Sequence, residues 1–201
     1  EIFLNEEAIN KKIVFSGDIG NTNKPMIKDP QYIKEADYVV MESTYGDRNH
    51  EKSNDYAIDL ANIINKTLSR GGNVIIPSFA VERTQELLYY MREIKERKLV
   101  PGNPNFPVYV DSPLAYEATK IYDANLSIYA DEQTLNLLKK GIDPLTFPNL
   151  IFTDSTDESK AINRAMIAKE LGYEYIFDVF FNRAYQLGAV GKQQYREYQL
   201  S

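Results

Sequence analysis

The sequence predicts an α/β fold in which helices cover a parallel sheet. From about residue 54 to residue 163, short apolar runs alternate with segments whose apolar residues recur every three or four positions, which is the order of strands and helices in such folds. The chain has 201 residues, of which 43% are hydrophobic and 26% are charged. This composition suits a packed globular core, and no apolar run approaches the roughly 18 residues that a membrane span requires.

Composition also limits the chemistry. The chain has no cysteine and one histidine, so disulfide frameworks, cysteine nucleophiles and thiolate metal sites are excluded. A zinc enzyme needs about two or three imidazoles per catalytic site, more than this chain supplies by itself. The formal net charge of −6 shows no strongly basic surface for nucleic acid, although a local patch is compatible with it.

The first forty residues predict three strands. Residues 1–5 and 11–15 flank a polar stretch and read as a hairpin, and residues 36–41 form a further apolar run. The last two strands are followed by Asp18 and by Glu42, at positions where α/β proteins commonly hold ligands. The N-terminal residues lack the basic segment followed by an apolar one that is typical of a signal peptide. They indicate that the chain starts inside a domain. We expect a cytoplasmic protein.

The rest of the chain predicts alternating helices and strands. The expected elements are a helix over 54–70 ended by two glycines, a strand over 73–77, a helix over 81–97, a strand over 108–110, a helix over 114–121, a polar helix near 131–140, a strand over 150–153 and a helix from 157. No internal repeat interrupts this order.

Two loops carry candidate acidic residues. Asp18 lies on a glycine-flanked turn, where a carboxylate can reach a cation or a substrate, or simply cap the turn. The segment 42–50 gathers Glu42, Ser43, a tyrosine, an arginine and the single His50 into one loop. That density suggests a functional site, and a solvated surface turn remains the alternative.

Two serine-led helix starts are candidate anion sites. Ser78 precedes the helix over 81–97, and Ser112 precedes Pro113 at an expected first helical position. Each serine can be a helix N-cap. Each can also belong to a phosphate-binding groove, in which helix amides, the hydroxyls and Arg83 hold an anion.

Four ordered segments give a resemblance to a family. Phe15–Gly20, Glu42–Arg48 with His50, Pro77–Leu87 and Val110–Ala115 resemble the metallo-β-lactamase-fold nucleases that carry a β-CASP domain. The resemblance covers roughly residues 1 to 163. It implies zinc-dependent hydrolysis of RNA phosphodiester bonds, with two zinc ions and an activated water.

The resemblance also implies roles for individual residues. Asp18 corresponds to the bridging metal carboxylate. Glu42 corresponds to the acidic residue of the first β-CASP motif, which supports the catalytic centre, and His50 matches a recurring position that we take as catalytic. The segments that line the RNA groove contain four candidate substrate-binding residues: Ser43, Ser78, Arg83 and Ser112.

The chain departs from the family pattern in several places. The family's His-x-His-x-Asp-His motif and its next histidine ligand precede the segment of Asp18 and are not in this chain, and neither are the two later histidine motifs. We therefore expect part of a metallo-β-lactamase/β-CASP ribonuclease that is inactive by itself. Its three expected regions are the end of the lactamase-like αββα domain over 1–52, a partial three-layer parallel-sheet β-CASP domain over 53–163, and an unassigned helical tail over 164–201.

Two other functions are compatible with the same sequence features. A non-catalytic RNA-binding or assembly module built on the β-CASP domain is the second hypothesis, and a hydrolase of a small molecule is a weaker third. We expect RNA as partner, no membrane, and a homodimer or association with the remainder of the enzyme. The sequence does not separate endonuclease from exonuclease, or RNA from DNA.

Overall fold

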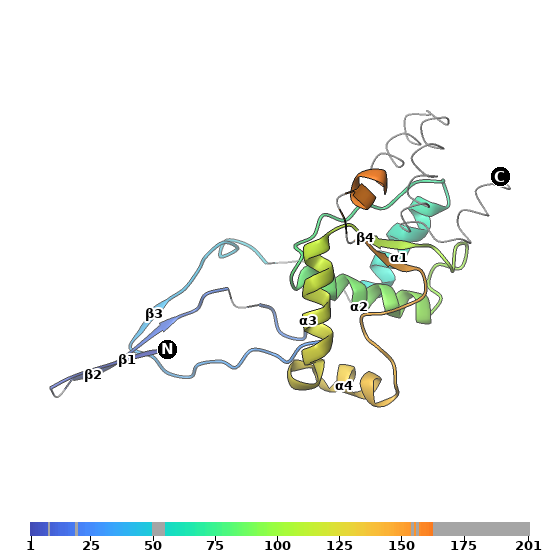
Figure 1. The fold of residues 1–201 in the computed structure, drawn as a ribbon. Coiled ribbons are helices and arrows are strands. Elements are labelled where there is room, and N and C mark those ends of the chain that lie inside the picture. The colour runs from blue at the N-terminus through green and yellow to red at the C-terminus, as the bar shows by residue number, and fades with distance from the viewer. Residues whose placement is uncertain (8, 19, 50–54, 154, 156, 163–201) are drawn as a thin grey trace.

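A computed structural model shows an α/β fold with two separate sheets in the part of the chain that it describes (Figure 1). The α/β class predicted from the sequence is confirmed. The structure describes residues 1–7, 9–18, 20–49, 55–153, 155 and 157–162. In chain order its elements are β1 (Ile2–Glu6), β2 (Ile9–Phe15), β3 (Tyr38–Val40), α1 (Tyr56–Leu68), α2 (Arg83–Glu96), β4 (Val108–Val110), α3 (Pro113–Tyr129), α4 (Glu132–Lys139) and β5 (Leu150–Phe152). None of the described helices is long and apolar enough to cross a membrane.

Strands β1, β2 and β3 form an arm that extends away from the helices (Figure 1). β1 and β2 pair antiparallel as the predicted hairpin, and β3 pairs parallel with β2, so that Phe15 lies opposite Val40. Val14 is 6% exposed, whereas Phe3 is 64% exposed. The arm therefore contributes little to the core, and contacts near residue 26 attach it to the rest of the molecule.

Helices α1 and α2 pack against each other and supply much of the core. α1 begins where the Asp55 side chain accepts a hydrogen bond from the Ile58 amide, which satisfies one of the free N–H groups of the first turn. Its buried residues Ala57, Ala61 and Ile64 recur at three and four positions, as the sequence predicts. The helix ends before Gly71, whose φ of 76° suits glycine.

The second sheet is formed by β4 and β5, which pair parallel. α3 follows β4 directly and runs to Tyr129, eight residues beyond the predicted end at Ile121. Ile121 and Ile128 are 65% and 58% exposed. Their outward position obscures the amphipathic pattern in the second half of the helix, which explains the short prediction.

The predicted strand over 73–77 is wrong. The structure assigns no strand to these residues, and Ile75 is 69% exposed. A strand needs a neighbour for its N–H and C=O groups, and within the described residues no backbone hydrogen bond joins this segment to β4. The described sheet beside α3 therefore has two strands, β4 and β5, instead of the three that the sequence predicts.

The arm joins the helical body through residues 26–28. Met26 is 2% exposed, and its carbonyl accepts a hydrogen bond from the Asp131 amide at 3.1 Å. Ile27 forms an isolated antiparallel bridge with Ala130, and the Lys28 amide donates to the Tyr129 carbonyl at 3.1 Å. The corner between α3 and α4 is thus the point where the segment after Asp18 is held.

Candidate functional site

The loops after β2 and β3 lie at one edge of the arm. Because these strands are parallel and adjacent, the backbone of Ser16 reaches the end of β3 and donates to the Val40 carbonyl at 2.9 Å. The Ser16 hydroxyl accepts from the Glu42 amide at 3.3 Å and donates to the Gly17 carbonyl at 2.7 Å. One side chain thereby connects the loop that carries Asp18 with the loop that begins at Glu42.

Gly17 shapes the turn before Asp18. Its φ of 53° lies in the left-handed region, and a Cβ added there would meet no atom within 4 Å. Backbone conformation, and not a lack of space, therefore favours glycine at this position. The turn leaves Asp18 exposed, where its carboxylate can meet a ligand.

Glu42 is held as a carboxylate. Its side chain accepts a hydrogen bond from the Thr44 amide at 2.7 Å, and this bond keeps the pKa of Glu42 below its usual value. Ser43 is exposed, and its carbonyl accepts from the Gly46 amide at 3.1 Å, which closes a tight turn. The same turn fixes the start of the loop, and Glu42 carries a negative charge at neutral pH.

The rest of this loop contains charged and aromatic groups in contact with each other. The Arg48 guanidinium lies 5.2 Å from the centre of the Tyr45 ring and 3.7 Å from the Asp47 carboxylate. Arg48 and Asp47 are largely exposed, so this ion pair adds little stability. His50 lies outside the described residues.

The described acidic residues do not complete a metal centre. Within the part of the chain that the structure describes, no group of three His, Cys, Asp or Glu side chains lies close enough to hold a metal ion. A structural zinc site takes four ligands and a catalytic one at least three. Asp18 and Glu42 alone therefore do not fit a site for two metal ions.

The start of α2 differs from the sequence prediction. The N-cap residue is Glu82, not Ser78, and no side chain caps the helix. The Ser78 hydroxyl lies 3.3 Å from both the Thr84 hydroxyl and the Phe79 carbonyl. The Thr84 hydroxyl in turn donates to that carbonyl at 2.7 Å. These side chains hold the segment before the helix, and the helix starts four residues later than a serine cap would place it.

Glu82 has a strained backbone. Its φ and ψ of 71° and −66° are those of a classic γ-turn, and the Arg83 amide donates to the Val81 carbonyl at 3.0 Å as this turn requires. Such a conformation costs a non-glycine residue about 1–3 kcal/mol. It persists only where neighbouring contacts hold it.

Arg83 presents a charged group at the start of α2. Its guanidinium donates to the Glu86 carboxylate at 2.7 Å, and the arginine side chain is 56% exposed. The exposed part of the guanidinium can still bind an anion. Two residues further along the helix, the Gln85 amide donates to the Thr119 hydroxyl at 2.9 Å and so joins α2 to α3.

Ser112 is the N-cap of α3, as the sequence predicts. Its hydroxyl accepts from the Ala115 amide at 3.2 Å, and Pro113 occupies the first turn. The neighbouring Asp111 carboxylate accepts from the Thr153 hydroxyl at 3.0 Å. These bonds link the ends of β4 and β5 to the beginning of α3.

Comparison with known proteins decides the family. The model of the Beta-Casp domain matches residues 84–190, more than half of the chain. The chain belongs to the β-CASP family. The match begins in the first turn of α2, includes Ser112, and extends into residues 164–190, which lie outside the described part and which the sequence analysis left unassigned.

Several curated proteins similar to this β-CASP chain carry ribonuclease names. Ribonuclease TTHA0252 of Thermus thermophilus is 37% identical over 163 residues, which are 81% of this chain and 36% of the relative. The RNase J-like protein of Methanocaldococcus jannaschii is 31% identical over 69% of this chain and 32% of its own length. Endoribonuclease YSH1 of Kluyveromyces lactis is 24% identical over 76% of this chain and 20% of its own length. The chain thus spans about a third or less of these relatives.

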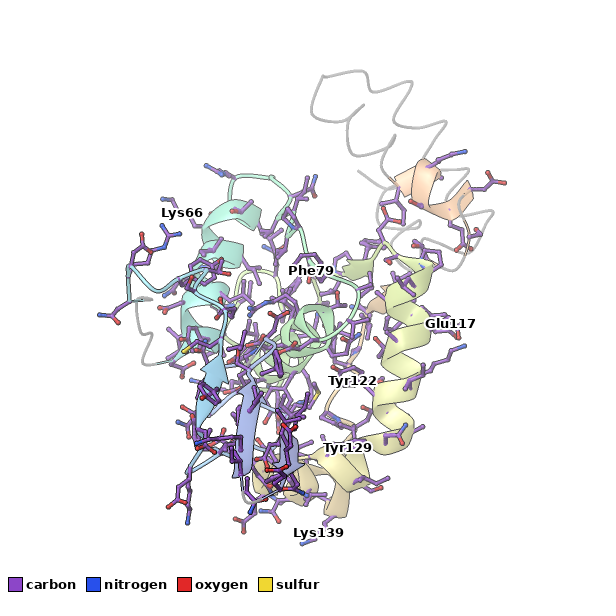
Figure 2. All side chains as sticks on the ribbon, turned by 90° about the vertical axis from the view of Figure 1, so that its left-hand side faces the viewer. Lys66, Phe79, Glu117, Tyr122, Tyr129 and Lys139 are labelled. Carbon is purple, nitrogen blue, oxygen red and sulfur yellow. The ribbon has the colours of Figure 1, made fainter. Side chains whose placement is uncertain are left out.

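The structure adds residues that the sequence reasoning missed in this β-CASP chain. Lys24 follows the Asp18 loop, and its amine contacts the Glu82 carboxylate at 2.5 Å. Burial, with a contribution from the Glu82 carboxylate, raises the pKa of Tyr122 on α3. Figure 2 shows Glu117 on the outer side of α3 and Tyr122 on the side toward the rest of the helical body. Lys24 and Glu82 are 58 positions apart, and no motif or spacing in the sequence pairs them.

Proposed function

We propose that this chain is part of a metal-dependent hydrolase that cleaves RNA phosphodiester bonds. The observation that carries the proposal is the β-CASP match together with relatives named as ribonucleases. The edge of the arm supports it, because the parallel strands β2 and β3 place the loops of Asp18 and Glu42 side by side. Acidic residues at adjacent strand ends suit a site that binds cations.

The proposed roles follow the sequence motifs. Asp18 contributes a metal-ligating carboxylate, and the ionised Glu42 supports the centre from the neighbouring loop. His50 is a proposed catalytic residue, and zinc is the proposed metal, with two ions per site. The described residues alone do not form such a site.

RNA binding is proposed for the start of α2 and the region around it. The partly exposed Arg83 guanidinium is the strongest candidate for contact with a phosphate. The hydroxyls of Ser43 and Ser78 lie on connecting segments that can approach the RNA backbone, and Ser112 adds the N-terminus of α3. The net charge of −6 makes such local positive groups decisive for binding.

A nuclease assay tests the catalytic part of the proposal. We expect the purified chain to bind less than one equivalent of zinc and to leave labelled RNA intact. The measurements are metal content after dialysis and cleavage of a labelled RNA with and without a chelator. Stoichiometric zinc together with chelator-sensitive cleavage would show that the chain is a complete enzyme, contrary to our expectation.

An RNA-binding or assembly module without catalysis is the second candidate. The exposed Arg83 favours it, because phosphate contacts give salt-dependent affinity with or without catalysis. We expect Arg83→Ala to weaken RNA binding and to reduce its salt dependence. Arg70→Ala, at an exposed position after α1, is the matched control. Equal loss in both variants, or no binding at low salt, would reject the module.

We also propose a cellular location and an oligomeric state for this chain. A cytoplasmic location agrees with an RNA substrate. A homodimer, or association with the remainder of the enzyme, agrees with the exposed apolar side chains of the arm. Sedimentation of the purified chain tests the dimer directly.

A further inference from the structure

We propose that the ion pair between Lys24 and Glu82 positions the Asp18 loop relative to the start of α2. This inference rests on the proposed function, because it links the two regions to which metal binding and RNA binding are assigned. Lys24 lies six residues after Asp18, and Glu82 immediately precedes Arg83. The ion pair is thus a short connection between the two regions.

The surroundings of Lys24 distinguish this ion pair from an ordinary surface pair. The Lys24 side chain is 18% exposed and the Glu82 side chain is 50% exposed, and the lysine amine lies 2.5 Å from the carboxylate. A Cβ added at Gly20 would meet the Lys24 amine at 3.4 Å, so the glycine leaves room for the lysine beside its own loop. Lys24 is therefore confined between the loop that carries it and the helix start that it contacts.

The backbone of Glu82 is strained. The γ-turn at Glu82 is unfavourable for a residue with a side chain, and strain of this kind persists where several contacts hold it. On one side the side chains of Thr84 and Gln85 hold the carbonyls of Phe79 and Ala80. On the other side Lys24 holds the Glu82 carboxylate. The turn therefore depends on Lys24, which belongs to the connecting segment, residues 16–37 between β2 and β3.

The connecting segment has a second attachment that makes this positioning effective. Residues 26–28 are fixed to the α3–α4 corner by the Met26 and Lys28 hydrogen bonds. With that corner fixed, the Lys24 contact holds the remaining end of the segment, on the side of Asp18. Without the contact, the hydrogen bonds that join residues 20–28 to the helical body, within the described part of the chain, all lie at the α3–α4 corner.

Distance measurements between spin labels test the positioning. The chain has no cysteine, so labels can be placed on Thr22→Cys and Lys66→Cys, both at exposed positions. We expect one narrow distance distribution, which broadens in Lys24→Met and in Glu82→Gln and narrows again in the charge-swapped pair Lys24→Glu with Glu82→Lys. Lys11→Met removes the ion pair to Asp37 inside the arm and is the control without effect. An unchanged distribution in Lys24→Met, or no recovery in the swapped pair, would overturn the inference.

The direction in which Glu82→Gln changes RNA affinity also tests the inference. If Glu82 acted only through its charge, Glu82→Gln would strengthen RNA binding, because a negative charge beside Arg83 is removed. Positioning predicts the opposite, a loss of about threefold to tenfold, the range expected for coupled contacts. Tighter binding in Glu82→Gln would overturn the inference. If the chain binds no RNA, the RNA-binding proposal fails, and the label distances still decide whether the ion pair positions the loop.

Discussion

Ser78 and Ser112 show how two residues with the same sequence context take different structural roles. Both precede a predicted helix, yet only the Ser112 hydroxyl accepts a bond from a first-turn amide. Ser78 instead contacts the Thr84 hydroxyl and the Phe79 carbonyl, each at 3.3 Å. The preference of serine for N-caps is a local property, and competing contacts of neighbouring side chains decide whether it is realised.

Alanine substitution at these two serines should have unequal effects. We expect Ser112→Ala to lower the free energy of unfolding by about 1 kcal/mol, because an amide of α3 loses its cap. Ser78→Ala is the matched control, with a loss of less than about 0.5 kcal/mol, because its contacts are long and no helix amide depends on it. Urea unfolding followed by circular dichroism measures both. Equal losses would contradict the assignment of Ser112 as the cap.

Glycine and alanine at position 82 isolate the backbone strain. Both substitutions remove the carboxylate that contacts Lys24, so their difference reports the backbone conformation, reduced by the greater freedom of glycine in the unfolded chain. We expect Glu82→Gly to be more stable than Glu82→Ala by about 1 kcal/mol, because only glycine adopts a φ near 71° without cost. Thermal unfolding of the two variants provides the comparison. A more stable alanine variant would mean that this residue is not strained.

Near the end of α2, Lys95 contacts residues of two loops. The Lys95 amine donates to the Phe106 carbonyl at 2.6 Å and lies 3.9 Å from the centre of the Phe106 ring. It also lies 5.8 Å from the centre of the Phe147 ring. Burial lowers the pKa of Lys95 to about 8, because the charged amine loses contact with water. α2 therefore depends on a cation that is partly desolvated.

The lowered pKa predicts how stability depends on pH. Between about pH 8 and 10.5 the folded chain binds fewer protons at Lys95 than the unfolded chain, so this residue makes the free energy of unfolding rise with pH. We expect a rise of about 1 kcal/mol or less, since partial exposure screens the effect. The measurement is the free energy of unfolding of the unmodified chain minus that of Lys95→Met, determined at each pH. A difference that stays constant or falls over this range would contradict the shift.

Helices and strands also differ in how well the sequence predicts them. α1 and α2 follow from apolar spacing because a helix satisfies its own backbone groups within one segment. The strand expected over 73–77 has equally apolar residues, but a strand forms only when another segment supplies its hydrogen bonds. Pairing between distant segments is not encoded in local spacing, so this prediction failed while the helices were found.

On the scale of the whole molecule, the arm and the helical body meet at a small junction. Met26 is buried there against the core at 2% exposure, whereas Met41, directly after β3, is 70% exposed. The two methionines have the same side chain in opposite environments. They allow the junction to be tested separately from the arm itself.

Substitution of these methionines should separate the two environments. We expect Met26→Ala to destabilise the junction by about 2–4 kcal/mol and to accelerate protease cleavage of residues 16–37 more than cleavage of the helices. Met41→Ala is the control and should change stability by less than about 0.5 kcal/mol. Mass spectrometry of the early cleavage products gives the sites. Uniform acceleration across the chain in Met26→Ala would show that no separate junction exists.

The sequence by itself determined the α/β class, the hairpin, the helical segments and the resemblance that the β-CASP match confirms. These features depend on residue order within short segments. The tertiary structure decided the start of α2, the absence of a strand over 73–77 and the contact between Lys24 and Glu82. Each of these depends on which groups meet after folding, because hydrogen bonds and ion pairs between distant residues are fixed by their positions in space. The roles proposed for Asp18, Glu42 and Arg83 use both sources. The sequence motifs identify these residues as candidates, and the tertiary structure shows which contacts hold their loops.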